Sequence, residues 1–160
     1  MDLPRELVER AKLVVDSNRY LTLGTTEPDG RSRVSPVYFT HVGYRDFYWV
    51  SSPAARHSAN IAARPDVAIV VFDSSVPAGA GQAVYIAARA AVVSDADLPR
   101  RCAEAFATVE APARPFAPDE LSGDADLRLY RAEATAHEVH VAASDPLYGV
   151  GRDSRRQVLL

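Results

Sequence analysis

Between Leu21 and Phe72 the chain is a succession of short strand-like segments joined by tight turns, and this order limits the possible folds more than any other feature. Residues 20–25 and 31–39 alternate in character and are separated by Glu-Pro-Asp-Gly, in which proline presets φ and glycine is free to take a positive φ. This pattern predicts a β-hairpin. Strands that are not regularly separated by crossover helices are antiparallel rather than doubly wound.

The rest of the chain extends the same pattern. Further strands are expected at residues 47–50, 67–72, 83–93, 127–133 and 136–141, and helices at residues 4–16, 53–63 and 95–109. The segment 67–72 is almost uniformly apolar, as in a strand that is buried on both faces. Six or so mostly antiparallel strands with flanking helices predict an α+β fold, a small closed or split β-barrel.

Size and composition limit the domain count and the partners. The 160 residues are expected to form one domain over residues 1–143, followed by an irregular polar tail over 144–160. A net charge of −3 provides no general basic field for nucleic acid. Charges at the N-terminus argue against a signal peptide, and no apolar run approaches the ~20 residues that cross a bilayer, so a cytoplasmic protein without membrane contact is expected. A single cysteine and four scattered histidines give no metal-ligand spacing.

The junction between the segment 47–50 and the following helix has the composition of an anion site. Ser52 suits an N-cap and Pro53 the first helical position, and the free N–H groups of a first helical turn attract anions. Arg56 lies near this helix start, with Asn60 one turn further on the same face. The alternative is that Arg56 is a solvated residue paired with a carboxylate, and the spacing leaves both interpretations open.

The strand at 31–39 supplies a second set of candidate residues. Alternation places Arg33 and Ser35 on one face, from which they reach a ligand across the strand ends if this strand adjoins residues 47–50. Pro36 lacks the N–H that a ladder bond needs, so an edge, a bulge or a ligand is expected at this point.

Several catalytic motifs are absent from the sequence. It contains no G-x-G-x-x-G after a strand, no P-loop, no H-E-x-x-H and no G-x-S-x-G. No side chain is indicated as a catalytic acid, base or nucleophile. If the chain is an enzyme, a cofactor is therefore expected to supply the chemistry.

The motifs that carry a family resemblance are Arg33-Val-Ser-Pro-Val-Tyr-Phe39, Phe47-Tyr-Trp-Val-Ser-Ser52, Ala55-Arg-His-Ser-Ala-Asn-Ile61, Arg64-Pro-Asp-Val67 and Gln82-Ala-Val-Tyr-Ile86. In this order and spacing, over about residues 6–95, the chain resembles the pyridoxamine 5'-phosphate oxidase-like flavin-binding split barrels, including their coenzyme F420-binding relatives. The resemblance implies a six-stranded antiparallel split barrel that forms a homodimer, with the flavin in the groove between the subunits.

The resemblance also implies roles for individual residues. Arg33 and Arg56 would contact the cofactor phosphate, and Gln82 would reach the flavin from the partner subunit. The remaining cofactor-lining positions implied in this way are Val34, Ser35 and Pro36 beside the isoalloxazine ring, and Val50 and Ser51.

Two departures from the family pattern qualify the functional expectation. His57 stands where the oxidases have lysine, so this position contributes a charge only when it is protonated. The C-terminal Arg/His motif that holds pyridoxamine phosphate does not match the tail, with its Arg152, Arg155 and Arg156, so vitamin B6 oxidation is not expected.

The predicted function is therefore that of a homodimeric FMN-binding oxidoreductase that acts on a small molecule. One alternative is an F420-dependent reductase, in which the longer anionic tail would use basic groups such as Arg31, Arg45 and Arg64. The other is a non-catalytic protein that binds or senses a flavin.

Overall fold

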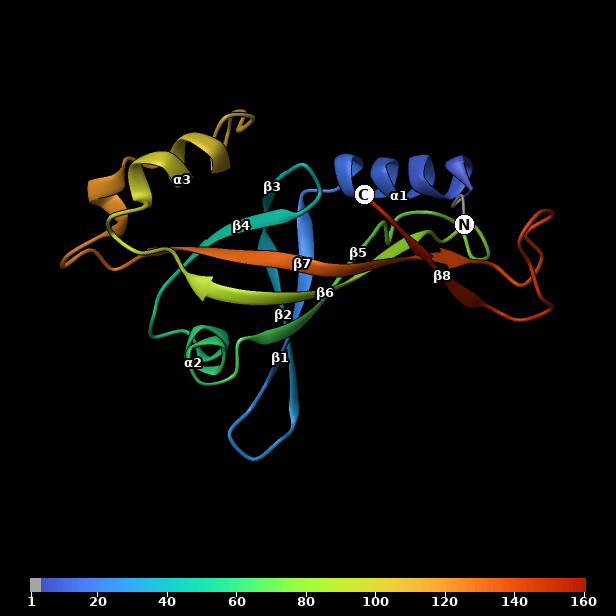
Figure 1. Cartoon of the computed structure of the whole chain (residues 1–160), viewed down its shortest axis with the longest axis horizontal. Helices are drawn as coiled ribbons and strands as arrows, with labels where there is room; N and C mark the ends of the chain where they lie inside the picture. The colour runs from blue at the N-terminus through green and yellow to red at the C-terminus, as the bar shows by residue number, and fades with distance from the viewer. Residues whose placement is uncertain (1–3) are drawn as a thin grey trace.

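The computed structural model describes residues 4–160, in which one antiparallel sheet is flanked by three α-helices and a short 3-10 helix (Figure 1). The strands are β1 (Tyr20–Thr26), β2 (Ser32–Tyr38), β3 (Thr40–Val42), β4 (Asp46–Ser51), β5 (Asp66–Phe72), β6 (Ala83–Val92), β7 (Arg128–Val141) and β8 (Ser154–Val158). The helices are α1 (Arg5–Ser17), α2 (Arg56–Ala63), α3 (Leu98–Ala105) and the 3-10 helix η1 (Pro118–Leu121).

The strands form one curled sheet in the order β2-β1-β5-β6-β7-β4-β3, with β8 paired to the free part of β7. Every pair is antiparallel. This confirms the α+β class and the antiparallel sheet. The predicted number of six strands is wrong, because the structure has eight strands, including the short β3 and the C-terminal β8.

The two closing strands predicted at 127–133 and 136–141 are one continuous strand of 14 residues, β7. The apparent break is a β-bulge. Ala134 and Ala136 pair with consecutive residues of β6, which leaves Thr135 as the extra residue, and the Thr135 hydroxyl donates to the Ala87 carbonyl at 3.1 Å. The bulge bends the strand without ending it.

The β1–β2 hairpin forms as predicted. The Gly30 N–H donates to the Glu27 carbonyl at 2.9 Å, and Gly30 has φ +87°, which glycine adopts without strain. β2 lies at the end of the sheet order, so Pro36 is in an edge strand, one of the three expected settings.

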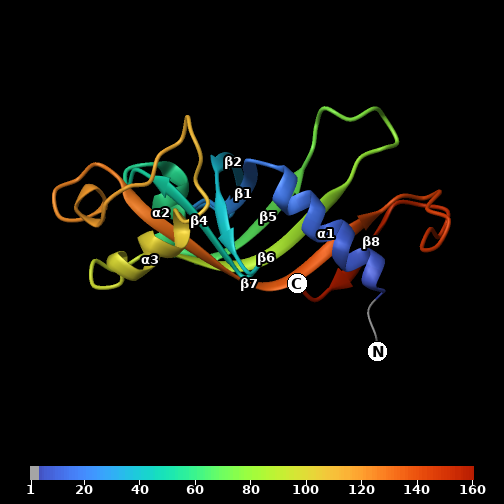
Figure 2. The same ribbon diagram turned by 90° about the horizontal axis from the view of Figure 1, so that it is seen from above.

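The core has two parts, on opposite faces of the sheet. The inner face, which α1 and α2 cover, buries the larger part, including Leu23, Trp49 and Val139. At the β4–β7 end α3 covers the outer face, where Tyr48 and Leu129 pack with its own Leu98 (Figure 2). Within residues 4–160 no helix covers the outer face of β1, β5 and β6.

This uncovered face explains the outcome for β5. Val67, Ile69 and Val71 are buried, whereas Ala68 and Phe72 are exposed. The prediction that this strand is buried on both faces is therefore wrong for the single chain.

Element boundaries also differ from the predictions at the two helices after β4. α2 begins at Arg56 with no side-chain cap, and the Ser52 hydroxyl instead accepts from the Ala54 N–H at 3.2 Å within a preceding turn. α3 covers residues 98–105 rather than 95–109.

The sequence predicts an irregular tail over residues 144–160, but part of this segment forms the strand β8. β8 pairs with β7 and buries Val158, which is 2% exposed. Its sequence, Ser-Arg-Arg-Gln-Val, offers one apolar side chain, too little to predict a strand. The free edge of the long β7 supplies the hydrogen bonds that order it.

Candidate cofactor site

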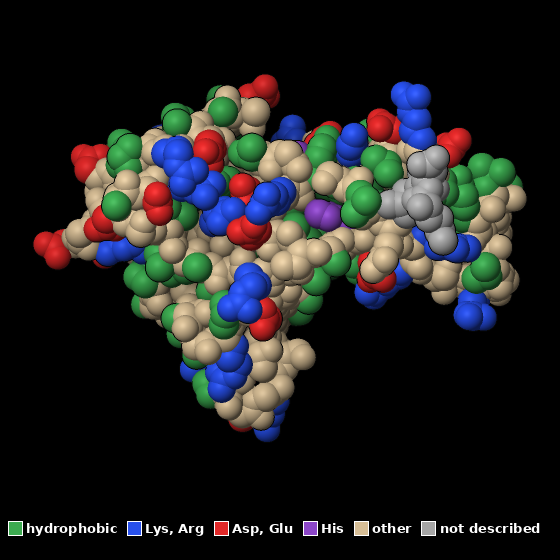
Figure 3. All heavy atoms as spheres, in the orientation of Figure 1, with side chains coloured by type: hydrophobic (Ala, Val, Ile, Leu, Met, Phe, Trp, Pro, Cys, Tyr) green, Lys and Arg blue, Asp and Glu red, His purple; other side chains and the backbone are tan. Residues whose placement is uncertain are grey.

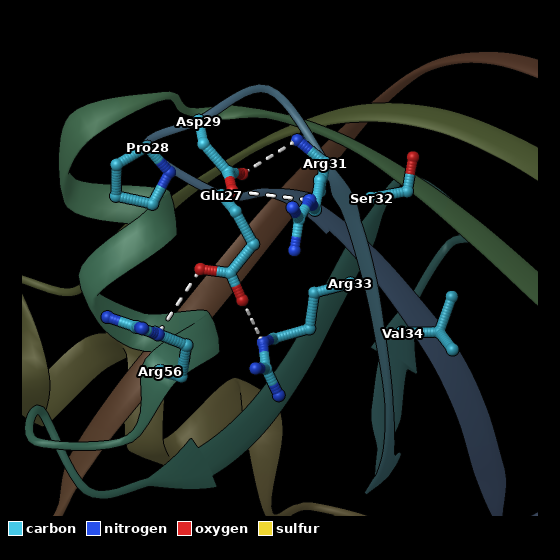
Figure 4. A pocket seen from close by; sticks show the side chains of 8 residues that line it. All are labelled: Glu27, Pro28, Asp29, Arg31, Ser32, Arg33, Val34 and Arg56. Atoms are coloured by element: carbon cyan, nitrogen blue, oxygen red, sulfur yellow. Dashed lines mark hydrogen bonds and ion pairs between the residues drawn. The ribbon is translucent and has the colours of Figure 1, made fainter.

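The tip of the β1–β2 hairpin and the start of α2 enclose a cleft of about 580 Å³ (Figure 4). This volume is in the range of about 300–1,000 Å³ that is typical of small-molecule sites. The cleft is lined by Glu27, Pro28, Asp29, Arg31, Ser32, Arg33, Val34 and Arg56. Basic side chains lie along the surface of this hairpin, which is the part that projects downward in Figure 3.

The structure brings Arg33 and Arg56 together, as the sequence predicted, but it places a carboxylate between them. The Arg33 Nε–H donates to one oxygen of Glu27, and the Arg56 Nε lies 3.2 Å from the other oxygen (Figure 4). The Glu27 side chain is only 13% exposed, whereas those of Arg33 and Arg56 are 44% and 61% exposed. The structure thus confirms the alternative in which Arg56 is a solvated residue paired with a carboxylate, and the anion-binding interpretation stays a prediction.

Glu27 engages only the Nε edge of each arginine. The terminal nitrogens of Arg33 and Arg56 point away from the carboxylate in Figure 4, and within residues 4–160 they have no hydrogen-bond or ion-pair partner. A guanidinium that presents these donors binds phosphate through paired hydrogen bonds. The two side chains therefore remain able to hold an anionic group.

His57 adds no permanent charge to this grip. Its Nε2 lies 3.0 Å from the Ser51 hydroxyl, and its pKa is lowered, first by burial and then by the charge of Arg33. The imidazole is consequently neutral at pH 7. Since His57 stands where the resemblance implies a lysine, the positive charge at this end of the cleft comes from Arg33 and Arg56.

Asn60 has a different role from the one predicted. It is 2% exposed, and its side-chain amide donates to the hydroxyl of the equally buried Thr25 at 3.1 Å. The bond fixes α2 against β1. Asn60 is therefore a structural residue that holds the helix, and with it Arg56, in place beside the hairpin.

The other residues predicted to line the cofactor divide between the two faces of the sheet. Val34 and Pro36 lie on the outer face, where Val34 is 69% exposed, and Ser35 lies on the inner face opposite Leu23. Val50 packs against the core under α3, while Ser51 contacts His57. Arg33, Val34 and Arg56 are thus the predicted residues that share the cleft.

Gln82 does not reach this cleft within one chain. It precedes Ala83, which pairs with Phe72 at the opposite end of β5 from the hairpin. The Gln82 side-chain oxygen is buried and has no hydrogen-bond partner in the described part of the chain. The expected contact of Gln82 with a cofactor would therefore come from a second subunit.

A second groove, also of about 580 Å³, runs across the uncovered outer face of the sheet. Its floor includes the small residues Gly24, Ala68, Ala87 and Ala136. Val34 lines both this groove and the arginine cleft, so the two are contiguous. At the β8 side the Arg155 guanidinium lies 3.5 Å from the centre of the Tyr85 ring, a cation–π contact.

Sequence reasoning missed Glu27, which it treated only as a turn residue. The signal was nevertheless present in the alternation, because Thr25 and Glu27 are two apart and Arg33 pairs with Thr25 across the hairpin. This puts the Glu27 and Arg33 side chains on the same face. Opposite charges at such diagonal positions favour an ion pair.

Within residues 4–160 no group of three or more His, Cys, Asp or Glu side chains is arranged to hold a metal ion. None of the helices in this range is long and apolar enough to cross a membrane.

The curled antiparallel sheet, the short helix after β4 and the arginine cleft at the hairpin are the features of a split-barrel protein. The family model described as pyridoxamine 5'-phosphate oxidase matches residues 7–141. The chain therefore belongs to the pyridoxamine 5'-phosphate oxidase family, which confirms the resemblance found in the sequence.

Solved structures share this fold at low sequence identity. A heme-binding protein from Mycobacterium smegmatis is 19% identical with a TM-score of 0.69, covering 98% of this chain, which spans 60% of that protein's length. An F420 reductase is 20% identical with a TM-score of 0.55, covering 79% of this chain and 94% of its own. A Clostridium acetobutylicum protein of the pyridoxinephosphate oxidase family is 12% identical with a TM-score of 0.60, covering 95% and 94%. A comparison with curated proteins found no match.

Proposed function

We propose that the chain is an FMN-binding oxidoreductase that exchanges hydride or electrons with a small molecule. The observation that carries this proposal is the convergence of Arg33 and Arg56 at the hairpin cleft, with terminal nitrogens that have no partner within residues 4–160. The cleft shares Val34 with the groove on the outer face, whose lining includes the small residues Gly24, Ala68, Ala87 and Ala136. A planar ligand that carries a phosphate, such as FMN, matches a site with a cationic cleft at one end and an apolar groove beside it.

The residues of the chain would bind and orient the cofactor. Arg33 and Arg56 would hold the phosphate, and Val34 with the small residues of the groove would lie against the ring. Bound FMN supplies the hydride-transfer or electron-transfer chemistry. The apolar groove would keep water from one face of the ring, which protects a reduced cofactor from side reactions.

We further propose that a second copy of the chain completes the site. The outer face of β1, β5 and β6 is the uncovered apolar surface, and Gln82 lies too far along the sheet to reach the cleft of its own chain. A homodimer through this face would cover the exposed side of β5. Ala68→Asp, in the middle of the face, should give a monomer in analytical ultracentrifugation and weaken flavin binding at the same time.

Coenzyme F420 is the second candidate, favoured by the likeness to an F420 reductase and by basic groups at the rim of the cleft. Arg31 lines the cleft and its side chain is 85% exposed, and Arg64 donates to the Pro28 carbonyl at 3.3 Å. Arg45 was also predicted as a possible contact for the F420 tail, but it does not line the cleft. It pairs with Glu133 at the β4–β7 end of the sheet.

The proposal is tested by titrating the purified protein with FMN, riboflavin and F420 while following fluorescence quenching. FMN should bind more tightly than riboflavin because of its phosphate. Arg56→Ala should weaken FMN about tenfold, the loss that corresponds to about 1.4 kcal/mol, and leave riboflavin unchanged. Arg100→Ala, an exposed arginine on α3, is the matched control and should change neither.

The outcomes separate the candidates. A protein that quenches neither FMN nor F420 would contradict the proposal. Tight F420 binding with weak FMN binding would identify the second candidate. Bound flavin that no nicotinamide or deazaflavin donor reduces would indicate the binding or sensing role instead of an enzyme.

A further inference from the structure

The proposed phosphate site contains an acidic residue, Glu27, whose negative charge opposes phosphate binding. The Glu27 carboxylate bridges Arg33 and Arg56, one oxygen to each, and its side chain is 13% exposed. The hairpin holds the residue in place, since the Glu27 N–H donates to the Arg31 carbonyl at 2.8 Å and its own carbonyl accepts from Gly30 at 2.9 Å. Any anion bound by the two arginines therefore lies next to a fixed negative charge.

The charges at the cleft can be counted from the contacts. Among the side chains that line the cleft, two arginines and one glutamate leave a single positive charge, and the exposed pair of Arg31 with Asp29, at 3.3 Å, adds none. Arg64 is not a lining residue and is outside this count, although it donates to the Pro28 carbonyl at the rim. His57 is neutral because burial and Arg33 lower its pKa. A phosphate monoester carries a charge of about −1.5 to −2 at pH 7. The lining side chains therefore neutralise only about half to two thirds of the charge of an FMN phosphate.

From this geometry we propose that Glu27 is a specificity-determining residue that keeps the phosphate affinity low, so that the flavin is an exchangeable ligand rather than a permanently held group. This inference rests on the proposed function. The carboxylate competes with the phosphate for the same two guanidinium groups and repels it when both are present. Removal of its charge, with its shape retained, is expected to tighten phosphate binding.

The decisive variant is Glu27→Gln in the full chain, because glutamine keeps the size, one oxygen acceptor and the backbone bonds of the turn. Its affinity for FMN relative to riboflavin should rise roughly tenfold over that of the wild type, as expected for one charge at a partly exposed site. Riboflavin, which has no phosphate, should bind equally to both proteins.

The matched control is Asp29→Asn, which removes a negative charge from the same turn. Asp29 lines the cleft but pairs with the exposed Arg31 rather than with Arg33 or Arg56. Its substitution should leave the ratio of FMN to riboflavin affinity within about twofold of the wild type, because its side chain is solvated and screened. An equal gain in both variants would show a general charge effect and overturn the role of Glu27.

A second measurement separates this inference from the proposed function. Inorganic phosphate is titrated into the wild type and Glu27→Gln, and the Nε–H resonances of Arg33 and Arg56 are followed by NMR. Tighter phosphate binding by the variant supports the inference even if neither protein binds a flavin, a result that would refute only the flavin proposal. Unchanged or weaker phosphate and FMN binding by Glu27→Gln would show that the carboxylate orients the arginines, and would overturn the inference.

Discussion

Two of the clusters in which arginines meet carboxylates within residues 4–160 are built differently. At the β4–β7 end, an interior network joins Asp46, Arg101, Glu104 and Arg131. One terminal nitrogen of Arg101 donates to both Glu104 and the Tyr48 hydroxyl at 3.0 Å, and the Arg131 Nε donates to Asp46 at 2.8 Å. The Arg101 and Arg131 side chains are 16% and 24% exposed. Each positive charge in this network has a carboxylate partner.

The hairpin cluster of Glu27, Arg33 and Arg56 has one carboxylate for two arginines. Its arginines are 44% and 61% exposed and pair through Nε alone. A network that stabilises the fold buries its donors and satisfies them, since an unpaired buried charge is costly. A site for an external anion instead keeps excess charge and open donors at the surface. Charge balance and exposure distinguish the two clusters.

The largest expected effect comes from breaking the interior network. Asp46→Asn keeps the side-chain shape but removes the charge that pairs with Arg131, and Asp46 is only 16% exposed. The free energy of unfolding should fall by about 2 kcal/mol, below the 3–5 kcal/mol of fully buried pairs. Urea denaturation measures this loss. A change under about 0.5 kcal/mol would mean that this network is no more structural than a surface pair.

The converse substitution is Arg33→Ala in the hairpin cluster. FMN affinity should fall about tenfold, or about 1.4 kcal/mol, because one guanidinium contact with the phosphate is lost. The free energy of unfolding should change by less than about 0.5 kcal/mol, because the lost arginine is exposed and Arg56 still pairs with Glu27. Parallel FMN titration and urea denaturation of Arg33→Ala and Asp46→Asn test the contrast. If Arg33→Ala lowered the free energy of unfolding as much as Asp46→Asn does, the proposed difference between the two clusters would be wrong.

A smaller effect is expected from His57 as the pH falls. Its folded-state pKa is lowered, mainly by burial, so below the unfolded-state value of about 6.5 the unfolded chain binds the proton more strongly. Stability is therefore complete above pH 6.5 and is lost as the pH falls through the lowered folded-state pKa.

His57→Gln should reduce this acid loss, measured as the slope of the unfolding free energy between pH 7 and 5. Part of the slope should remain, because burial also lowers the pKa of His137, whose Nε2 lies 2.7 Å from the Tyr44 carbonyl in the core. An unchanged slope in His57→Gln would place the acid sensitivity elsewhere.

The smallest effect is expected for Arg100, a fully paired but exposed residue. It lies 3.5 Å from Asp97 and 3.4 Å from Glu104 on α3, and its side chain is 57% exposed. Arg100→Ala should alter the free energy of unfolding by less than about 0.5 kcal/mol. A larger loss in urea denaturation would show that charge pairing without burial is enough to stabilise this fold.

Local patterns were sufficient where one segment determined the outcome. The turn residues at 27–30 predicted the hairpin, and the alternation in β2 placed Arg33 and Val34 on opposite faces. The family motifs predicted the split-barrel class and the meeting of Arg33 with Arg56. The hairpin and the faces of β2 follow from turn chemistry and a two-residue period, both of which are visible in a single stretch of chain, whereas the other two features were implied by the family resemblance.

Local sequence patterns failed where the structure of a segment depends on its pairing with a distant segment. The weak pattern of β8 became a strand because β7 offered a free edge, and Thr135 became a bulge because β6 continues past it. Asn60 resembled an anion ligand on the helix but bonds to Thr25 in the core. In each case the partner lies more than ten residues away, beyond the range of a local pattern.

The sequence by itself determined the antiparallel class, the hairpin and the two arginines of the candidate site, because these depend on residue type and local spacing. Only the tertiary structure decided that Glu27 lies between those arginines, that within residues 4–160 no helix covers the outer face of β1, β5 and β6, and that burial lowers the pKa of His57. Charge balance and burial depend on which side chains meet across the fold. These contacts set the electrostatics that separate an ion pair from a ligand site.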